Sequence, residues 1–234
     1  MKTFCIVCFA AIFSALLQDA SGQGFANLDF ESANVSEHSP GDEVATSAAL
    51  PSWTAYFSSS SNPTASSLST IGYDGLSLGP ASINLEDSNA PNGTGGFSLF
   101  PIQGNYSVFL QGSQGSVPFP PGTSTSIGQT GTIPNTAQSI TFFAILGGNF
   151  QVTFNGQNIS YSAIGSGINY TIYGANISGY AGQTGQLLFT APDQTSTLLD
   201  NIQFSSSSVP EPSEFALSGL GTLILGFRRW TKRR

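Results

Sequence analysis

The residues of this chain that could do chemistry are almost all carboxylates. Residues 23–208 hold ten of them and a single histidine, His38. Two carboxylates suffice for glycoside hydrolysis, and several carboxylate oxygens together can hold a hard cation such as Ca²⁺. These carboxylates could therefore take part in either glycoside hydrolysis or cation binding, and they are Asp29, Glu31, Glu37, Asp42, Glu43, Asp74, Glu86, Asp87, Asp193 and Asp200.

The sequence lacks the residues that other catalytic mechanisms require. A Ser-His-Asp hydrolase would need His38, which lies in a polar stretch and is expected to be exposed, and no Gly-x-Ser-x-Gly elbow precedes a helix. The only cysteines, Cys5 and Cys8, lie in an apolar run near the N-terminus, so the body has no thiol nucleophile and no disulfide. Asp29 and Glu31 fit plain strand alternation as well as an acid/base pair. We therefore expect no enzymatic activity.

The distribution of positive charge excludes a further class of function. The 234 residues carry a formal net charge of −7, and no Lys or Arg occurs between Thr3 and Phe227. Binding to nucleic acid needs a basic surface that neutralises phosphates, so we exclude it. Charged residues make up 8% of the chain, which indicates a surface built mainly from Ser, Thr, Asn, Gln and Gly.

The N-terminus has the pattern of an export signal. Lys2 precedes an apolar run over residues 4–17, and small residues follow at Ala20 and Gly22. This order is typical of a signal peptide, so we predict that residues 1–22 are removed after Gly22, with cleavage after Ala20 as the alternative. A retained membrane helix is the other interpretation, although the run is short for a bilayer.

The C-terminus has the pattern of a second targeting signal. Residues 209–213 are Val209, Pro210, Glu211, Pro212 and Ser213, an apolar stretch covers 215–227, and a basic tail covers 228–234. A helix of that length spans only about 20 Å of a hydrocarbon core about 30 Å thick. An ordinary anchor helix is one interpretation. The basic residues that would stop the chain at the membrane are Arg228, Arg229, Lys232, Arg233 and Arg234.

In this order, the three parts of residues 209–234 resemble the PEP-CTERM sorting signal of bacterial proteins. The resemblance implies processing by an exosortase-type enzyme after the short transmembrane helix has held the protein transiently in the inner membrane. The product would then be attached to the cell surface or released outside the cell, often among exopolysaccharide.

The body, residues 23–204, reads as an all-β domain. Short alternating runs are separated by Gly, Pro, Asn and Ser, and no stretch has helical periodicity. The pattern predicts an antiparallel two-sheet β-sandwich of the jelly-roll type, followed by a serine linker at 205–208. The expected strands are 27–31, 53–57, 82–86, 106–111, 138–144, 150–154, 169–173, 186–190 and 198–204.

The first and last of these runs resemble galactose-binding-like jelly rolls, the fold of many carbohydrate-binding modules. The resemblance lies in 27–31 (NLDFE), in Trp53 after Leu50, and in 199–204 (LDNIQF). We expect a non-catalytic surface or matrix protein associated with polysaccharide. A carbohydrate-binding module is the alternative, and a two-carboxylate glycoside hydrolase is a less favoured one. Aromatic side chains available to a sugar are Trp53, Tyr56, Tyr73, Tyr161, Tyr170, Tyr173 and Tyr180.

Asp200 suggests a structural cation. Strand alternation groups it with Leu198, Ile202 and Phe204 on an apolar face, where an unpaired carboxylate is costly and no Lys or Arg is at hand. Asp200 is then protonated, held by backbone N–H groups, or bound to a cation, most suitably calcium. The resemblance to carbohydrate-binding jelly rolls implies Glu31 and Asp200 as the calcium ligands, with Asp29 as a weaker third.

Overall fold

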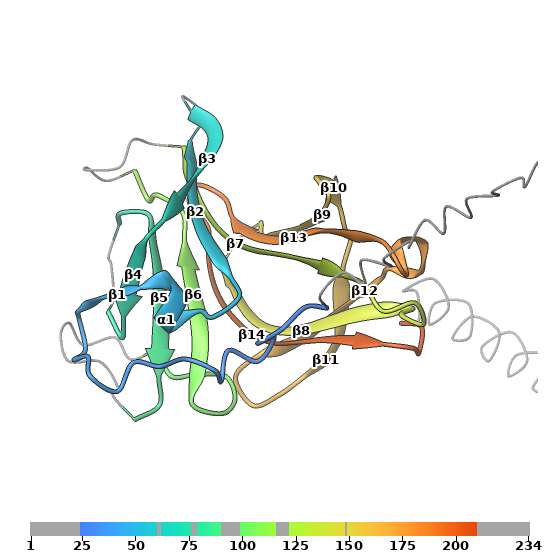
Figure 1. The fold of residues 1–234 in the computed structure, drawn as a ribbon, viewed down its shortest axis with the longest axis horizontal. Coiled ribbons are helices and arrows are strands. Elements are labelled where there is room, and N and C mark those ends of the chain that lie inside the picture. Colours follow the sequence, from blue (N-terminus) through green and yellow to red (C-terminus); the bar gives the residue numbers. More distant parts are fainter. Residues whose placement is uncertain are drawn as a thin grey trace, which may run out of the picture.

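Two β-sheets packed face to face form the described part of the chain (Figure 1). The computed structural model describes residues 24–59, 62–75, 79–89, 99–115, 122–147 and 149–209. The predicted all-β sandwich is confirmed. The predicted signal peptide and the sorting signal, apart from Val209, lie outside the described residues.

The larger sheet has eight strands. All neighbouring pairs are antiparallel except β4 and β5, which run parallel. The last strand of the chain, β14, lies at the centre of this sheet between β6 and β8, so the two halves of the sequence are joined there. The strand order is β1 (Glu43–Ala45), β4 (Thr70–Tyr73), β5 (Ser82–Asp87), β6 (Tyr106–Gln111), β14 (Ser196–Ser205), β8 (Ser139–Gly147), β12 (Thr171–Asn176) and β11 (Ser162–Ser166).

The smaller sheet has six strands, all antiparallel to their neighbours. Two short helical turns, α1 (Thr46–Ala49) and η1 (Ser178–Tyr180), complete the described elements. The strand order is β10 (Gln157–Asn158), β9 (Gln151–Phe154), β13 (Thr184–Ala191), β7 (Thr123–Thr132), β2 (Thr54–Ser59) and β3 (Asn62–Leu68).

Apolar side chains from both sheets fill the space between them. In β13 every second residue, Leu187, Phe189 and Ala191, is buried there. Phe189 meets Phe142 of β8 edge to face, with ring centroids 5.6 Å apart. Full burial of one such large side chain contributes roughly 1.5–3 kcal/mol, so this aromatic contact holds the two sheets together.

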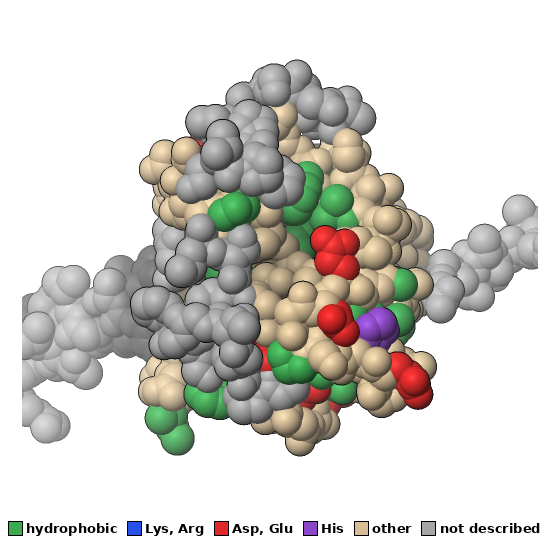
Figure 2. Space-filling view, turned by 90° about the vertical axis from the view of Figure 1, so that its left-hand side faces the viewer, with side chains coloured by type: hydrophobic (Ala, Val, Ile, Leu, Met, Phe, Trp, Pro, Cys, Tyr) green, Lys and Arg blue, Asp and Glu red, His purple; other side chains and the backbone are tan. Residues whose placement is uncertain are grey.

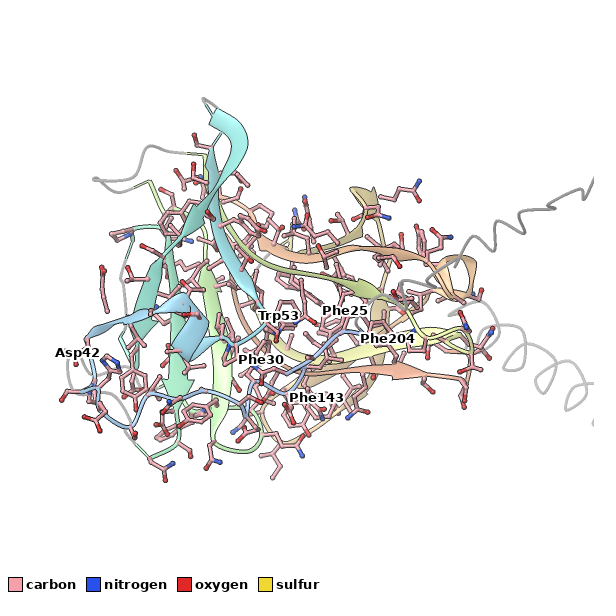
Figure 3. All side chains as sticks on the ribbon, in the orientation of Figure 1. Phe25, Phe30, Asp42, Trp53, Phe143 and Phe204 are labelled. Atoms are coloured by element: carbon pink, nitrogen blue, oxygen red, sulfur yellow. The ribbon has the colours of Figure 1, made fainter. Side chains whose placement is uncertain are left out.

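The predicted strand at 27–31 is wrong. Asn27 and Phe30 have φ angles of 49° and 59°, and the segment forms turns. The Asn27 side chain accepts a hydrogen bond from the Ser32 N–H at 3.0 Å, a local bond that competes with strand pairing. Phe30 is nevertheless fully buried, and its ring packs on Trp53 at 5.7 Å (Figure 3). The Trp53 indole N–H donates to the Asn27 carbonyl at 2.9 Å.

The face predicted for Asp200 is also wrong, although its burial is confirmed. Leu199, and not Leu198, belongs to the core between the sheets. A bulge between Asp200 and Gln203, with Asn201 at φ 46°, shifts the alternation so that Ile202 returns to that core. Asp200 is only 1% exposed, but it lies on the opposite face of the larger sheet, here called the outer face.

The serine linker predicted at 205–208 begins inside the fold. Ser205 is the last residue of β14 and pairs with Ser139 of β8. The Ser139 hydroxyl donates to the Ser207 carbonyl at 2.7 Å. The β-sandwich therefore extends beyond residue 204.

Candidate functional site

An apolar groove lies on the outer face of the larger sheet. Its floor includes Leu198 of β14 and Ile145 of β8, which lie directly opposite each other and so share one face. The groove has a volume of about 510 Å³. The segment before β6 supplies one wall and the turn between β11 and β12 supplies the other, and the lining residues are Leu99, Phe100, Pro101, Ile102, Ile145, Gly167, Ile168, Asn169, Tyr170 and Leu198.

The groove exposes large apolar side chains to solvent. Ile168 is 97% exposed and Phe100 is 58% exposed, one on each wall. Ile145 on the floor is 43% exposed. Single exposed apolar residues are ordinary, whereas a contiguous set around one hollow is typical of binding surfaces.

Tyr170 is the aromatic side chain with a fixed position in this groove. Its ring stacks on Phe143 of β8 with centroids 4.7 Å apart and planes inclined by 24°. Gly167 lies against the same ring, and its N–H donates to the Tyr170 carbonyl at 2.9 Å. A Cβ atom at Gly167 would overlap the ring, so the turn needs glycine there. The ring is thereby held in one orientation, as a binding surface requires.

Most other predicted sugar-stacking residues are used for packing. Trp53 and Tyr73 are buried, and Tyr161, Tyr173 and Tyr180 pack against the core. Tyr56 is half-buried, and its hydroxyl oxygen accepts a 3.2 Å hydrogen bond from Gln186. Of the predicted aromatic residues, Tyr170 alone lines the groove among the described residues.

Phe100 was not among the predicted aromatic residues, because phenylalanine is normally a core residue. It precedes Pro101, outside any strand, where no periodicity signals its exposure. The position of a Pro directly after it is the one available signal, since a residue before proline favours an extended loop.

Asp200 lies next to this groove in a closed hydrogen-bonding site. Its Oδ2 accepts hydrogen bonds from the Gln103 N–H at 2.9 Å and the Ser107 hydroxyl at 2.8 Å, and its Oδ1 accepts one from the Asn201 N–H at 2.6 Å. Burial raises the pKa of Asp200 to about 7, against the opposing effect of these three donors and with a further increase from Glu31. Among the three predicted outcomes, the arrangement fits a carboxyl group held mainly by backbone N–H groups.

Glu31 connects the N-terminal segment to the start of β6 through hydrogen bonds. Its Oε1 accepts hydrogen bonds from the N–H groups of Asn105 at 2.8 Å and Tyr106 at 3.0 Å. Its Oε2 accepts one from the Asn105 side chain at 2.9 Å. Asp29, the third predicted ligand, is exposed and accepts a long 3.4 Å hydrogen bond from the Glu31 N–H.

In the structure the oxygens of the predicted calcium ligands are used in hydrogen bonds within the protein. The oxygens of Glu31 and Asp200 face hydrogen-bond donors, which a bound cation would have to replace. Within the described residues no group of three or more His, Cys, Asp or Glu is placed to hold a metal ion. Calcium bound by Glu31, Asp200 and Asp29 stays a prediction.

His38 is exposed, as expected. Its Nδ1 lies 4.0 Å from an Asp42 carboxylate oxygen, and both side chains reach solvent at the end of the molecule that carries β1. Figure 2 shows this face, with the histidine beside Asp and Glu side chains. No helix in the described ranges is long and apolar enough to cross a membrane.

Comparisons with known proteins find distant likeness in structure alone. No protein-family model and no curated protein matches the chain. The carbohydrate-binding module TmCBM61, solved with β-1,4-galactotriose, is 13% identical with a TM-score of 0.29, over 78% of this chain and 97% of the module. An α-L-rhamnosidase from Dictyoglumus thermophilum is 14% identical with a TM-score of 0.23, over 72% of this chain and 25% of the enzyme.

Proposed function

We propose that this protein is a non-catalytic carbohydrate-binding β-sandwich that binds a neutral polysaccharide in its outer groove. The observation that carries the proposal is the fixed Tyr170 ring in an open groove whose opposite wall exposes Phe100. Sugar rings have apolar C–H faces that pack on aromatic side chains, and the Tyr170 hydroxyl and the exposed Asn169 amide offer hydrogen bonds beside them.

The charge of the chain favours a neutral ligand. The net charge is −7, and the body has no Lys or Arg to pair with a uronic acid or a sulfate ester. An acidic polysaccharide would be repelled from the surface as a whole, most strongly at low salt. A neutral galactan, glucan or mannan meets no such repulsion.

Isothermal titration calorimetry with soluble neutral polysaccharides, β-1,4-galactan among them, tests the proposal. We expect binding by the wild-type protein and an affinity at least about tenfold lower for Tyr170→Ala and for Phe100→Ala, which corresponds to the loss of one aromatic contact. Tyr56→Ala is the matched control, because this half-buried tyrosine lies on the other sheet, and its affinity should equal that of the wild type.

Two results would overturn the proposal. Binding that Tyr170→Ala and Phe100→Ala leave intact would place the sugar site elsewhere. Reducing ends released from the polysaccharide by the wild type, and lost in a carboxylate variant, would instead support the glycoside hydrolase alternative.

We also propose that the mature protein acts outside the cell. The proposal rests on the two terminal signals, 1–22 and 209–234, which combine a short apolar run with Lys2 at the first and five basic residues at the second. Intact-mass measurement on protein extracted from the host's surface should give a chain that starts near Gln23 and ends near residue 210. Detection of Trp230 in that material would contradict removal of the sorting signal.

A further inference from the structure

A second group of polar side chains is buried on the outer face of the larger sheet, at β4 and β5. Ser82, Asn84 and Glu86 alternate along β5 and so point to the same face. Gly72 of β4 lies opposite Asn84 in the parallel pair, and Asp74 follows β4, with its N–H bonded to the Leu85 carbonyl at 2.8 Å.

Several of these buried atoms have no hydrogen-bond partner. Glu86 is 1% exposed and Asn84 is 5% exposed. Yet Glu86 Oε1, Asn84 Nδ2 and Ser82 Oγ have none. Leaving one such group unsatisfied costs about 1–3 kcal/mol, so the neighbouring buried groups of Asn84 and Glu86 on one face of the strand are a candidate for ligand binding.

The described residues contain no Lys or Arg that could act as a counterion at this place. Asp74, 3% exposed, lies close enough to Glu86 to oppose its ionisation. Burial and this repulsion raise the pKa of Glu86 to about 8. No Lys or Arg occurs in the body, and His38 lies by Asp42. A proton or a bound cation would relieve the repulsion between the two carboxylates.

The Asn84 amide separates these two possibilities. A proton on Glu86 would satisfy its carboxyl group but would leave the amide NH₂ of Asn84 without an acceptor. Amide oxygen and nitrogen positions are interchanged by a 180° rotation, which would turn the Asn84 oxygen toward the place now faced by its nitrogen. Carboxylate, amide and hydroxyl oxygens are the ligands of a hard cation.

We propose that Glu86 and Asn84, together with Asp74, bind a Ca²⁺ ion on the outer face of β4 and β5. Calcium accepts six to eight oxygen ligands in a flexible arrangement, whereas Mg²⁺ usually retains several waters, which a site this buried would not hold. This site is separate from the one predicted at Glu31 and Asp200, since Glu86 lies on β5 and Asp200 on β14, with β6 between them.

A pocket lined by both polar and apolar residues opens beside Asn84. It has a volume of about 520 Å³, and Ser82, Asn84 and Gly72 are among its lining residues. Asp42 and Glu43 also line it, and both are exposed. Figure 3 shows Asp42 at the end of the molecule where β1 and β4 lie. Exposed carboxylates beside such an opening attract a divalent cation from solution.

The test measures calcium binding and thermal stability of the full chain at pH 7. We expect one Ca²⁺ bound per chain in calorimetry, and a melting temperature that rises with calcium and falls in chelator. Glu86→Gln keeps the shape of the side chain but removes its charge, so the calcium response should disappear. Glu37→Gln is the control: this carboxylate is exposed and does not line the pocket, so its loss should leave the response unchanged.

Asp200→Asn distinguishes the two calcium sites. A response that persists in Asp200→Asn and disappears in Glu86→Gln supports the proposal. The reverse pattern, or a wild-type protein that neither binds calcium nor melts differently in chelator, overturns it. Should Glu86→Gln not fold, elemental analysis of dialysed wild type and of Asn84→Ala gives the same decision, with calcium retained by the first and lost by the second.

Discussion

The Ser107 hydroxyl donates a 2.8 Å hydrogen bond to the Asp200 carboxylate, between residues 93 positions apart in the chain. Ser107 is itself an acceptor for the Ile102 N–H at 2.8 Å. The segment that forms one wall of the outer groove is thus tied through Ser107 and Asp200 to the central strand of the larger sheet. For this reason, the hydrogen bonds of Asp200 affect both the stability of the fold and the geometry of the groove.

Stability should fall as pH rises through the titration range of Asp200. Burial raises its folded pKa to about 7 from an ordinary value of 3.8, so between these pH values the folded state holds a proton that the unfolded state has released. This contribution is complete below pH 4 and is lost by about pH 7.5, a decrease of at most about 4 kcal/mol. Urea unfolding at several pH values in chelator measures it.

Asp200→Asn is the comparison for this pH dependence. The variant should be less stable than the wild type at low pH, with a difference that shrinks as pH rises. The pKa of Glu86 is raised in both proteins, so Glu86 adds the same pH dependence to each. Subtracting the free energy of unfolding of the variant from that of the wild type removes this contribution. A difference between wild type and variant that grows from pH 4 to pH 7.5 would contradict the raised pKa.

Gly104→Ala should destabilise the fold through Glu31. Gly104 has φ +65°, and a Cβ atom there would overlap the Glu31 carboxylate, which would lose its hydrogen bonds to Asn105 and Tyr106. Gly156→Ala is the matched control, because Gly156 has φ +76° and nothing within 4 Å of the added Cβ. Both variants include the cost of a positive φ, so denaturant unfolding should show about 1–3 kcal/mol more loss for Gly104→Ala. Equal losses would show that the Glu31 contacts contribute nothing.

Gly167→Ala should weaken polysaccharide binding although it replaces no side chain that contacts the sugar. The added Cβ would overlap the Tyr170 ring and push it away from Phe143. Gly165→Ala, in the same hairpin, adds a Cβ that meets Ile172 at an ordinary 3.4 Å. Titration calorimetry should show an affinity about tenfold lower for Gly167→Ala and unchanged for Gly165→Ala. Equal affinity for the two variants would show that the ring orientation is unimportant.

Much of the fold follows from local patterns in the sequence. The run predicted at 106–111 coincides with β6, and those predicted at 53–57, 82–86 and 186–190 differ from β2, β5 and β13 by at most two residues at either end. These strands alternate large apolar and polar residues, which local composition reveals. The strand β7 was missed, because Thr123–Thr132 contains one large apolar residue, Ile127, and is held in place by its neighbours β2 and β13.

The sequence by itself determined the charge, the absence of Lys and Arg from the body and hence the exclusion of nucleic acid, and the alternation of most strands. Only the tertiary structure decided that the outer face of the larger sheet is covered, so that Leu198, Glu86 and Asp200 are buried there. Alternation assigns side chains to two faces, but it does not show which face another segment will cover. The positive φ at Asn201 lies in the bulge of β14, after which the side chains that were expected on one face of the sheet lie on the other. Asn201 is held there by a hydrogen bond from its side chain to Gln103, a residue about a hundred positions away in the chain.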